Sequence, residues 1–300
     1  ETASHLTVFQ RTPNWVIPRR DVPITDAEKA LQMTRPDIAV ELAERNRKTI
    51  WETADHFFWQ AFSWTPEGRA AYETVARNHL ENQVPDPALR AKLTPDYPVG
   101  CKRILISDDF YPALLGETGR LVTDGIDHID ASGVVDGAGL HHACDILVLA
   151  TGFETTGWHW SVEVIGEGEQ SLARTWEEAP EAYLGITVAG FPNFFVLYGP
   201  NTNLGHNSIT FMIECQVDYM LKALEALDAR GARAMAPRQD AQDRYNSDLQ
   251  ASLAQTVWAD PHCNSWYKTA DGRITQNWSS NTDAYAKAIS VVAVEDYAFA

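Results

Sequence analysis

The amino-acid sequence predicts a mixed α/β protein with a helical insertion and a small β-meander, and three observations lead to this class. A helical pattern occupies the residues from Thr25 to about Arg90. A continuous apolar run, DILVLATGF at 145–153, is typical of a central strand in a parallel sheet. A long helix is expected from Ile209 onwards, because apolar residues recur there at steps of three and four.

The first hundred residues should hold one strand followed by the helical block. The run LTVF at 6–9 predicts a strand close to the start of the sequence. The segment TDAE, which begins at Thr25, has the form of a helix capping box. Two further helices are expected to begin at Pro66 and Pro87, since each proline follows a residue that can cap a helix.

The residues from 101 to 150 predict short strands. KRILIS, at 102–107, has a strand pattern and follows the turn-rich LTPDYPVG. Three Asp-Gly or Ser-Gly turn signals between residues 124 and 137 predict a meander, which leads into the buried strand at 145–153.

The remaining sequence predicts one more strand, two helices and a hairpin. The strand is expected at 193–199, in NFFVLYG. The helix that starts near Ile209 should stop at Gly231, and another helix should follow Pro237. Asp271-Gly272, between two alternating runs, is a hairpin signal.

The charge balance narrows the possible partners. The chain has 24 basic and 41 acidic residues and a net charge of −17, so its field repels nucleic acid and anionic lipid. A nucleic-acid partner and a stable membrane anchor are therefore not expected, and the apolar runs are far too short to span a bilayer. A small anionic cofactor would need a local cluster of Arg and Lys.

Neither the cysteines nor the histidines indicate a metal site. The four cysteines form no C-x-x-C pair and do not suggest a dense disulfide framework, so a reducing cytoplasm fits best. His141-His142 favours a pair at a strand edge, because no third metal ligand stands at a suitable spacing.

Cations stand at two places where a phosphate could bind. Arg11 and Thr12 follow the first predicted strand, and in doubly wound nucleotide-binding folds an Arg at such a strand end can read a ribose 2′-phosphate. The alternative is a solvated Arg in a turn. Lys102 and Arg103 adjoin at the start of another strand, where they could face two ligands or be ordinary exposed cations.

Two turns could bring the backbone close to a ligand. Gly152 directly follows the predicted buried strand. Gly205, His206 and Asn207 precede the strong helix, whose N-terminus favours negative charge, although Asn207 or Ser208 could simply cap that helix. The sequence contains neither a G-x-G-x-x-G nor a G-x-S-x-G motif.

Four segments in order resemble the C-terminal portion of flavin-dependent Baeyer-Villiger monooxygenases, near the hydroxyacetophenone monooxygenase branch. The segments are LTVFQRTPNWVIPRRD, GCKRILISDDFYPALL, DILVLATGF and LYGPNTNLGHNSITFMIE. Any one of them would be a weak signal, whereas their joint order is specific.

The resemblance implies FAD and NADPH as cofactors, and a ketone and O₂ as substrates. It assigns Arg11, Thr12 and Lys102 to the NADPH 2′-phosphate, and Arg103 to the active site. There an Arg would favour a flavin C4a-peroxide anion, which attacks the ketone to form an ester or lactone. The positions expected near the flavin or the substrate cavity are Thr151, Gly152, Phe153, Asn201, Gly205, His206, Asn207 and Trp266. For Trp266 the alternative, an ordinary aromatic residue of the core, stays open.

The resemblance also implies a domain division. Residues 1–145 would form part of an NADPH-binding domain, with a helical insertion at about 25–92, and residues 146–300 the C-terminal part of an FAD-binding domain. Both Gly-rich loops of the family are absent from this sequence, so a missing N-terminal half is expected. Two alternatives stay open: an inactive or partner-requiring fragment, and a flavin monooxygenase that oxygenates nitrogen or sulfur.

Overall fold

The computed structural model describes residues 3–63, 65–152 and 162–300. The chain forms two units, each of which is held together by contacts among its own residues. Unit 1 comprises Glu1–Ile24 and Ala70–Phe153, and unit 2 comprises Thr25–Arg69 and Glu154–Ala300. Residues 25–69 of the expected insertion therefore belong to the same unit as the C-terminal residues.

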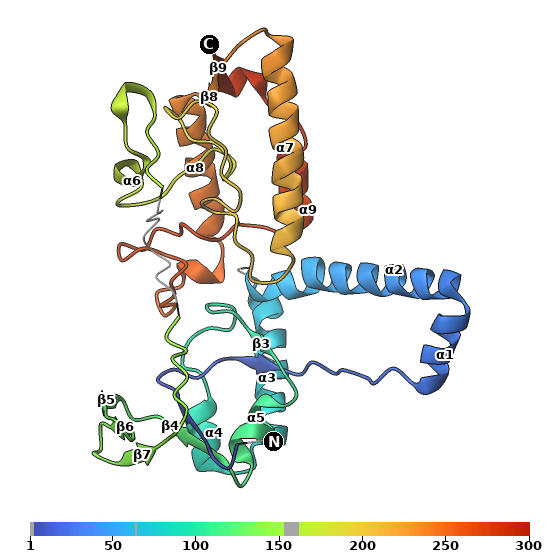
Figure 1. Ribbon diagram of the computed structural model, residues 1–300, viewed down its shortest axis with the longest axis vertical. Coiled ribbons are helices and arrows are strands. Elements are labelled where there is room, and N and C mark those ends of the chain that lie inside the picture. Colours follow the sequence, from blue (N-terminus) through green and yellow to red (C-terminus); the bar gives the residue numbers. More distant parts are fainter. Residues whose placement is uncertain (1–2, 64, 153–161) are drawn as a thin grey trace. The chain divides into compact units, whose positions relative to one another are not determined.

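Unit 1 is built on two pairs of parallel strands. Strand β1 (Leu6–Phe9) pairs with β4 (Gly119–Val122), and β2 (Val16–Ile17) pairs with β3 (Leu105–Ile106) (Figure 1). Parallel pairing of segments about a hundred residues apart requires a crossover, and the chain supplies helices between them. The predicted strands at 6–9 and within 102–107 are confirmed, although the second is short.

Three helices pack around these strands: α3 (Pro66–Gln83), α4 (Pro87–Leu93) and α5 (Phe110–Leu115). Helices α3 and α4 begin at the two predicted prolines, and Asp86 caps α4 by accepting a hydrogen bond from the Ala88 amide. The shared core consists of buried Val16, Leu80, Val84, Leu93, Tyr111 and Leu114.

The predicted meander is present as β5 (Ile126–Ile129), β6 (Gly133–Asp136) and β7 (His141–Ala143), paired antiparallel in that order. Both histidines lie in β7. His142 Nε2 is 2.8 Å from Asp136 Oδ2 in a buried pair. No cluster suited to a metal ion occurs among the described residues.

The predicted buried strand at 145–153 is wrong for the residues that the structure describes. Residues 145–152 form no regular structure, and Ile146 and Val148 are 77% and 79% exposed. An apolar strand is buried only when other strands flank it, and no described strand pairs with this segment. The strand expected at 193–199 is also absent, since only an isolated bridge joins Phe195 to Thr187.

The N-terminal part of unit 2 is helical. It contains α1 (Asp26–Thr34), α2 (Pro36–Glu52), a π-helical turn η1 (Thr53–Phe57) and a 3₁₀ turn η2 (Phe58–Ala61). The predicted capping box is confirmed, because Thr25 and Glu28 exchange both of its hydrogen bonds. The π turn continues directly from α2 and places a buried Asp55.

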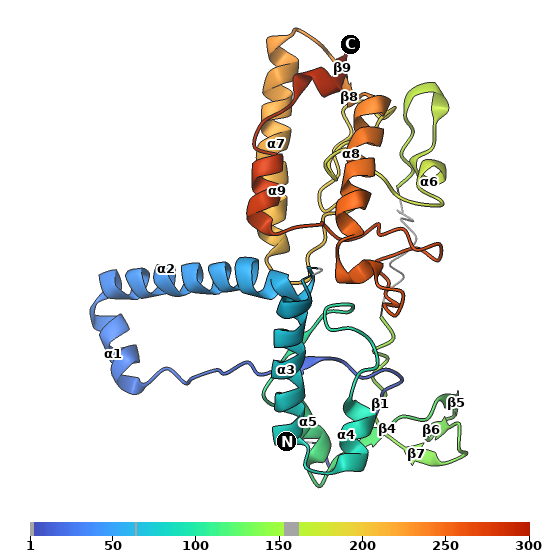
Figure 2. The same ribbon diagram turned by 180° about the vertical axis from the view of Figure 1, so that it is seen from behind.

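The C-terminal part of unit 2 packs around two long helices, α7 (Ile209–Ala229) and α8 (Gln239–Leu253). Ser208 caps α7, and Gly231 follows its end with a φ of +61°. Helix α9 (Thr282–Ala288) contacts α7 (Figure 2). The smaller elements are η3 (Glu167–Glu169), α6 (Leu172–Thr175), β8 (Met235–Pro237), η4 (Val257–Ala259), η5 (Val294–Asp296) and β9 (Tyr297–Phe299).

Two further predictions for this part of the chain can be checked. The hairpin is confirmed by an antiparallel bridge between Lys268 and Ile274, with Gly272 at a φ of +93° in its turn. Strands β8 and β9 pair antiparallel and were not predicted. Across the described ranges, no helix is both long and apolar enough to cross a membrane.

Candidate functional site

A pair of cations lies in unit 1 beside the end of β1. Arg11 is exposed and Lys102 is partly buried. Burial lowers the pKa of the Lys102 amine and so does the charge of Arg11, while Asp96 raises it. The charges of Arg11 and Lys102 are therefore near enough to repel each other. The fold brings these two predicted residues into the same region although they are far apart in the sequence.

Tyr97 connects the two segments that carry these cations. Its hydroxyl donates to the Pro13 carbonyl at 2.9 Å, and its own carbonyl accepts a hydrogen bond from Trp15 Nε1, also at 2.9 Å. The Lys102 ammonium lies 4.7 Å from the centre of the Tyr97 ring, in cation–π geometry. The turn between Tyr97 and Lys102 passes through Gly100, whose φ of +86° favours glycine.

Arg11 and Arg103 form no ion pair within the described ranges of this acidic chain. Several other arginines are paired with carboxylates, namely Arg19, Arg35, Arg77, Arg238, Arg244 and Arg273. Both Arg11 and Arg103 are exposed. Their guanidinium groups are therefore available to an anion.

A second cluster in unit 2 surrounds the buried carboxylate of Asp55. Its Oδ1 accepts hydrogen bonds from the Thr282 amide (2.8 Å), the Thr282 hydroxyl (2.6 Å) and Asn207 Nδ2 (3.1 Å). Its Oδ2 accepts a bond from the Asp283 amide. His206 Nε2 is 3.7 Å from Oδ1, beyond hydrogen-bond length, and both side chains are fully buried.

Burial of the Asp55 carboxyl opposes ionisation, yet its contacts with His206, Thr282 and Asn207 outweigh that cost. They hold the pKa of Asp55 well below its usual range. The carboxylate is therefore charged, and it joins η1 to the turn before α7 and to the start of α9. Two of the sequence-predicted residues, His206 and Asn207, contact it.

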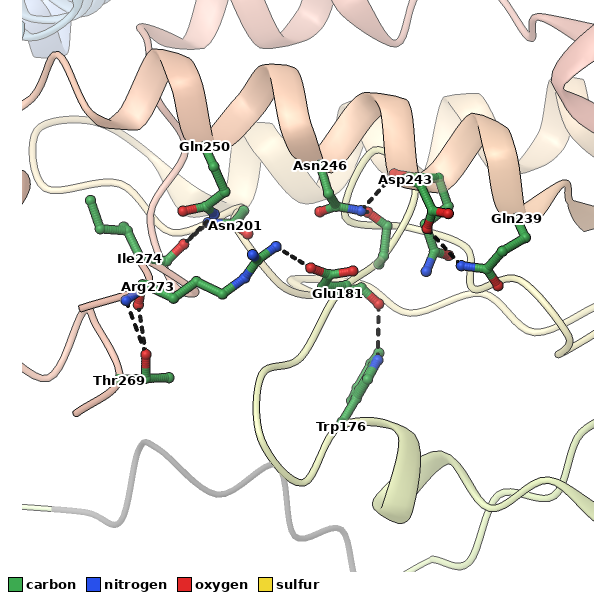
Figure 3. Close-up of polar contacts among 12 residues, drawn as sticks. Trp176, Glu181, Asn201, Gln239, Asp243, Asn246, Gln250, Thr269, Arg273 and Ile274 are labelled. Atoms are coloured by element: carbon green, nitrogen blue, oxygen red, sulfur yellow. Dashed lines mark hydrogen bonds and ion pairs between the residues drawn. The ribbon is translucent and has the colours of Figure 1, made fainter. Parts of the chain in front are cut away.

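Asn201, in the same turn, is held by hydrogen bonds to the hairpin segment. It has a φ of +58°, and its Nδ2 donates to the carbonyls of Ile274 (2.8 Å) and Asn277 (3.0 Å). Figure 3 shows Gln250 of α8 donating to the same Ile274 carbonyl, at 2.8 Å. The amide of this buried side chain is thus engaged with the hairpin.

Close packing accounts for Gly205. A Cβ added at this position would lie 2.6 Å from Phe62 Cε1, and the Phe62 side chain is buried. The His206 ring packs on Trp59 and Phe62, with centroids 5.2 and 5.9 Å away. Neither ring nitrogen of His206 has a hydrogen-bond partner among the residues that the structure describes.

Trp266 lies at the other end of a series of aromatic rings. It is 43% exposed and packs on Tyr267 at 4.5 Å, and Tyr267 in turn contacts Trp258, which contacts Phe62. The series thereby joins Trp266 to the residues that pack against His206.

The remaining predicted residues belong to the exposed segment after the meander. Thr151 and Gly152 are exposed, and Gly152 has a φ of +88°. Phe153 lies outside the described residues. The sequence reasoning missed Tyr97 and Asp55. Tyr97 stands in the segment DYPVGCKR beside the predicted Lys102, whereas nothing in the helical pattern around Asp55 distinguishes it from a surface acid.

Comparisons with known proteins show what this arrangement is similar to. No protein-family model matches the chain. A Baeyer-Villiger monooxygenase of Streptomyces coelicolor is 39% identical over 293 residues, covering 97% of this chain and 56% of that protein. A Baeyer-Villiger monooxygenase of Pseudomonas aeruginosa is 36% identical, covering 92% of this chain and 52% of that protein.

The chain is homologous to Baeyer-Villiger monooxygenases. A solved oxidised steroid monooxygenase bound to NADP matches it with a TM-score of 0.79 and 28% identity, over 99% of this chain and 62% of that one. OTEMO in complex with FAD and NADP also has a TM-score of 0.79, at 25% identity, over 100% of this chain and 63% of that one.

The chain spans about half the length of the curated Baeyer-Villiger monooxygenases that it matches. The family recognised from the four sequence segments is confirmed, and so is the mixed α/β class of a flavoprotein with two dinucleotide-binding domains. The domain boundary at 145/146 and the roles of individual residues stay predictions.

Proposed function

We propose that this chain contributes to an NADPH- and FAD-dependent monooxygenase that inserts an oxygen atom from O₂ beside a ketone carbonyl, forming an ester or lactone. The observation that carries the proposal is the Arg11–Lys102 pair. Arg11 follows the parallel strand β1 and Lys102 precedes β3. The charge of Arg11 acts on Lys102, and neither cation has an ion-pair partner in the described ranges of a chain with a net charge of −17. Such a pair suits a dianionic phosphate.

NADPH would be held through its 2′-phosphate. The Arg11 guanidinium offers a planar fork of donors, Thr12 adds a hydroxyl, and Lys102 adds a compact ammonium. The burial that lowers the pKa of Lys102 strengthens its attraction to an anion, because the local dielectric is lower there. These three residues suit the 2′-phosphate of NADPH. NADH has no 2′-phosphate, so it offers them no such group to bind.

When bound, FAD reduced by NADPH would supply the chemistry that activates O₂. Arg103 would stabilise negative charge at the reacting oxygen atoms, because its exposed guanidinium forms no ion pair in the described part of the chain. An arginine suits this task because it cannot act as a proton donor that quenches the negative charge.

The turn of residues 201–207 would form part of the wall of the flavin site. The polar atoms of Asn201 and Asn207 are engaged with protein groups, so their side chains hold the turn in place. Direct contacts of Gly205, His206, Thr151 or Gly152 with FAD stay predictions, as does a place for Trp266 at the substrate cavity. The proposal also includes a cytoplasmic location, where NADPH is available as reductant.

Replacing Arg103 with Ala tests the assigned chemistry in the FAD-containing protein, by which we mean a longer polypeptide that contains these residues and both Gly-rich loops. Ester formation from a panel of ketones, measured by gas chromatography, should fall at least about a hundredfold, while the flavin content should stay unchanged. Arg103→Lys should restore little, since a single ammonium does not replace a planar fork. Arg19→Ala is the matched control, because Arg19 is an exposed arginine of the same unit paired with Asp21.

Retained ester formation in Arg103→Ala would contradict the role of Arg103. A wild-type protein that oxidises NADPH and converts sulfides or amines, but no ketone, would instead favour sulfur or nitrogen oxygenation. A protein that contains both cofactors and converts none of these substrates would favour the inactive-fragment alternative.

A further inference from the structure

Tyr97 is buried at the junction of the two segments that carry the candidate phosphate-binding cations. It is 7% exposed, and its hydroxyl, its carbonyl and its ring each contact a different group. Burial raises the pKa of the Tyr97 hydroxyl to about 12, opposed by the backbone of Trp15 and assisted by the charge of Asp96. The hydroxyl therefore stays protonated and donates a hydrogen bond at any working pH.

The Tyr97 hydroxyl restrains the backbone that follows Arg11 and Thr12. It donates to the carbonyl of Pro13, whose ring fixes its own φ and restricts the backbone of Thr12 before it. The indole of Trp15, two residues further, donates to the Tyr97 carbonyl. With Pro13 and Trp15 both anchored on one residue, the backbone that presents Arg11 has few alternative conformations.

The ring of Tyr97 determines where Lys102 lies. The ammonium sits 4.7 Å from the ring centre, and the ring face attracts it. This attraction acts against two effects that disfavour the charged amine, namely its partial burial and the nearby charge of Arg11. The ring thus helps to keep Lys102 charged and close to Arg11 before any anion arrives.

We propose that Tyr97 is the positioning residue for nucleotide selectivity, which holds Arg11, Thr12 and Lys102 in a preorganised site for a 2′-phosphate. This inference rests on the proposed function. Tyr97 acts through the cations and makes no contact of its own with the nucleotide. Its effect should therefore be confined to ligands that carry a 2′-phosphate, because only those use both cations.

Two substitutions separate the contributions of the hydroxyl and the ring. Tyr97→Phe removes the bond to Pro13 and keeps the ring beneath Lys102, whereas Tyr97→Leu removes both. Each is measured in the FAD-containing protein by calorimetric titration with adenosine 2′,5′-bisphosphate and with adenosine 5′-monophosphate. The ratio of KM for NADPH to KM for NADH provides an independent readout.

The affinity of Tyr97→Phe for the 2′,5′-bisphosphate should fall about fivefold, as expected for one lost hydrogen bond. Tyr97→Leu should lose about a further threefold with the cation–π contact. Affinity for the 5′-monophosphate should change by less than about twofold in both, since it does not use the paired cations. Arg11→Ala is the reference, and Tyr111→Phe is the control, because Tyr111 is another buried tyrosine of unit 1.

Equal losses for the two nucleotides in Tyr97→Phe would show a general structural role and overturn the inference. Unchanged affinities in both Tyr97 variants would also overturn the inference. In that case, an Arg11→Ala variant that loses affinity for the 2′,5′-bisphosphate alone would leave the proposed function standing. If the wild type binds both nucleotides equally and Arg11→Ala changes neither, the proposed phosphate site fails and the inference fails with it. Far-UV circular dichroism and flavin content identify a variant that is misfolded, and Tyr97→Phe then decides the question.

Discussion

Asn207 donates a hydrogen bond from Nδ2 to a carboxylate oxygen of Asp55 that lies 3.1 Å away, although 152 positions separate the two residues in the sequence. The same oxygen accepts hydrogen bonds from the amide and the hydroxyl of Thr282. One buried acid thus connects the π turn η1, the turn before α7 and the first residue of α9. The position of the 201–207 turn depends on a residue from the helical insertion.

Replacing Asp55 with Asn should destabilise unit 2. The amide cannot supply the charge that His206 faces, and its NH₂ group must oppose either the donors of Thr282 and Asn207 or the amide of Asp283. Removing one partner from a buried charged network costs about 3 kcal/mol. The free energy of unfolding, measured with urea, should fall by that order.

Asp283→Asn is the matched control for this substitution. Asp283 is exposed and adjoins Thr282 in the first turn of α9, so it undergoes the same change of charge without losing a buried contact. Its cost should be below about 1 kcal/mol. Similar losses in the two variants would show that the Asp55 network adds nothing beyond a favourable charge near the start of α9.

The stabilising effect of Asp55 should depend on pH with a defined sign. Its folded-state pKa lies below the unfolded value, so the unfolded state binds the proton more tightly. The contribution is fully present above the unfolded pKa of about 4 and is lost as the pH falls towards the folded pKa. The difference in unfolding free energy between wild type and Asp55→Asn should be constant from about pH 7 to about pH 5, and should shrink in more acidic buffer. A difference that grows on acidification would contradict the assigned ionisation.

The sequence could reveal the cation pair but not the buried acid, and the reason is physical. Arg11 stands at the carboxyl end of a strand signal, where ligands bind in doubly wound folds, and the resemblance to the family segments indicated Lys102 just before β3. Asp55 stands in a helical pattern of ordinary polarity, and only the contact of η1 with residues 206–207 and 282–283 makes it a buried charge. Tyr97 likewise stands a short distance before the predicted Lys102 in the sequence, with no local sign that its hydroxyl reaches Pro13.

The failed strand at 145–153 shows a second limit of sequence patterns. An apolar run indicates that a segment can be buried. Whether it is buried depends on neighbouring strands and helices, which the run itself does not specify. In the described residues Ile146, Val148 and Leu149 are all at least 70% exposed. Helix α7 and the capping box at Thr25 were predicted correctly because hydrogen bonds and side-chain periodicity within one segment determine them.

Replacing Gly205 with Ala should shift the turn before α7. The new Cβ would lie 2.6 and 2.7 Å from two atoms of the Phe62 ring, which is buried and therefore cannot easily move. Overpacking of this kind costs about 1–3 kcal/mol. Combining it with Phe62→Leu, which shortens the opposing side chain, should cost less than the sum of the two single changes. Strictly additive unfolding free energies in this double-mutant cycle would argue against the close contact.

Replacing Arg11 with Ala should impair the use of NADPH and spare NADH. The guanidinium would lose about 2 kcal/mol of charge-assisted hydrogen bonding to the 2′-phosphate, which corresponds to about a thirtyfold rise in KM for NADPH. Steady-state oxidation of both nucleotides by the FAD-containing protein measures the two values. Arg20→Ala serves as the control, since Arg20 is an exposed arginine of the same unit. Equal rises in KM for the two nucleotides would remove the phosphate-reading role from Arg11.

The chain of residues 1–300, purified by itself, should bind no flavin and oxidise no NADPH. Tight binding of a dinucleotide relies on a Gly-rich loop whose amides contact the pyrophosphate, and this sequence contains no G-x-G-x-x-G. In addition, the exposed apolar residues at 146–149 need covering before the segment can serve as a sheet strand beside a cofactor.

Two measurements test this prediction on the isolated chain. One is the absorbance between about 350 and 500 nm, where bound flavin absorbs, and the other is the rate of NADPH oxidation. A longer polypeptide that contains both Gly-rich loops and these residues is the control and should be yellow. A yellow preparation of residues 1–300 would show that the cation pair and the 201–207 turn suffice to hold the cofactors, and the need for the loops would have to be abandoned.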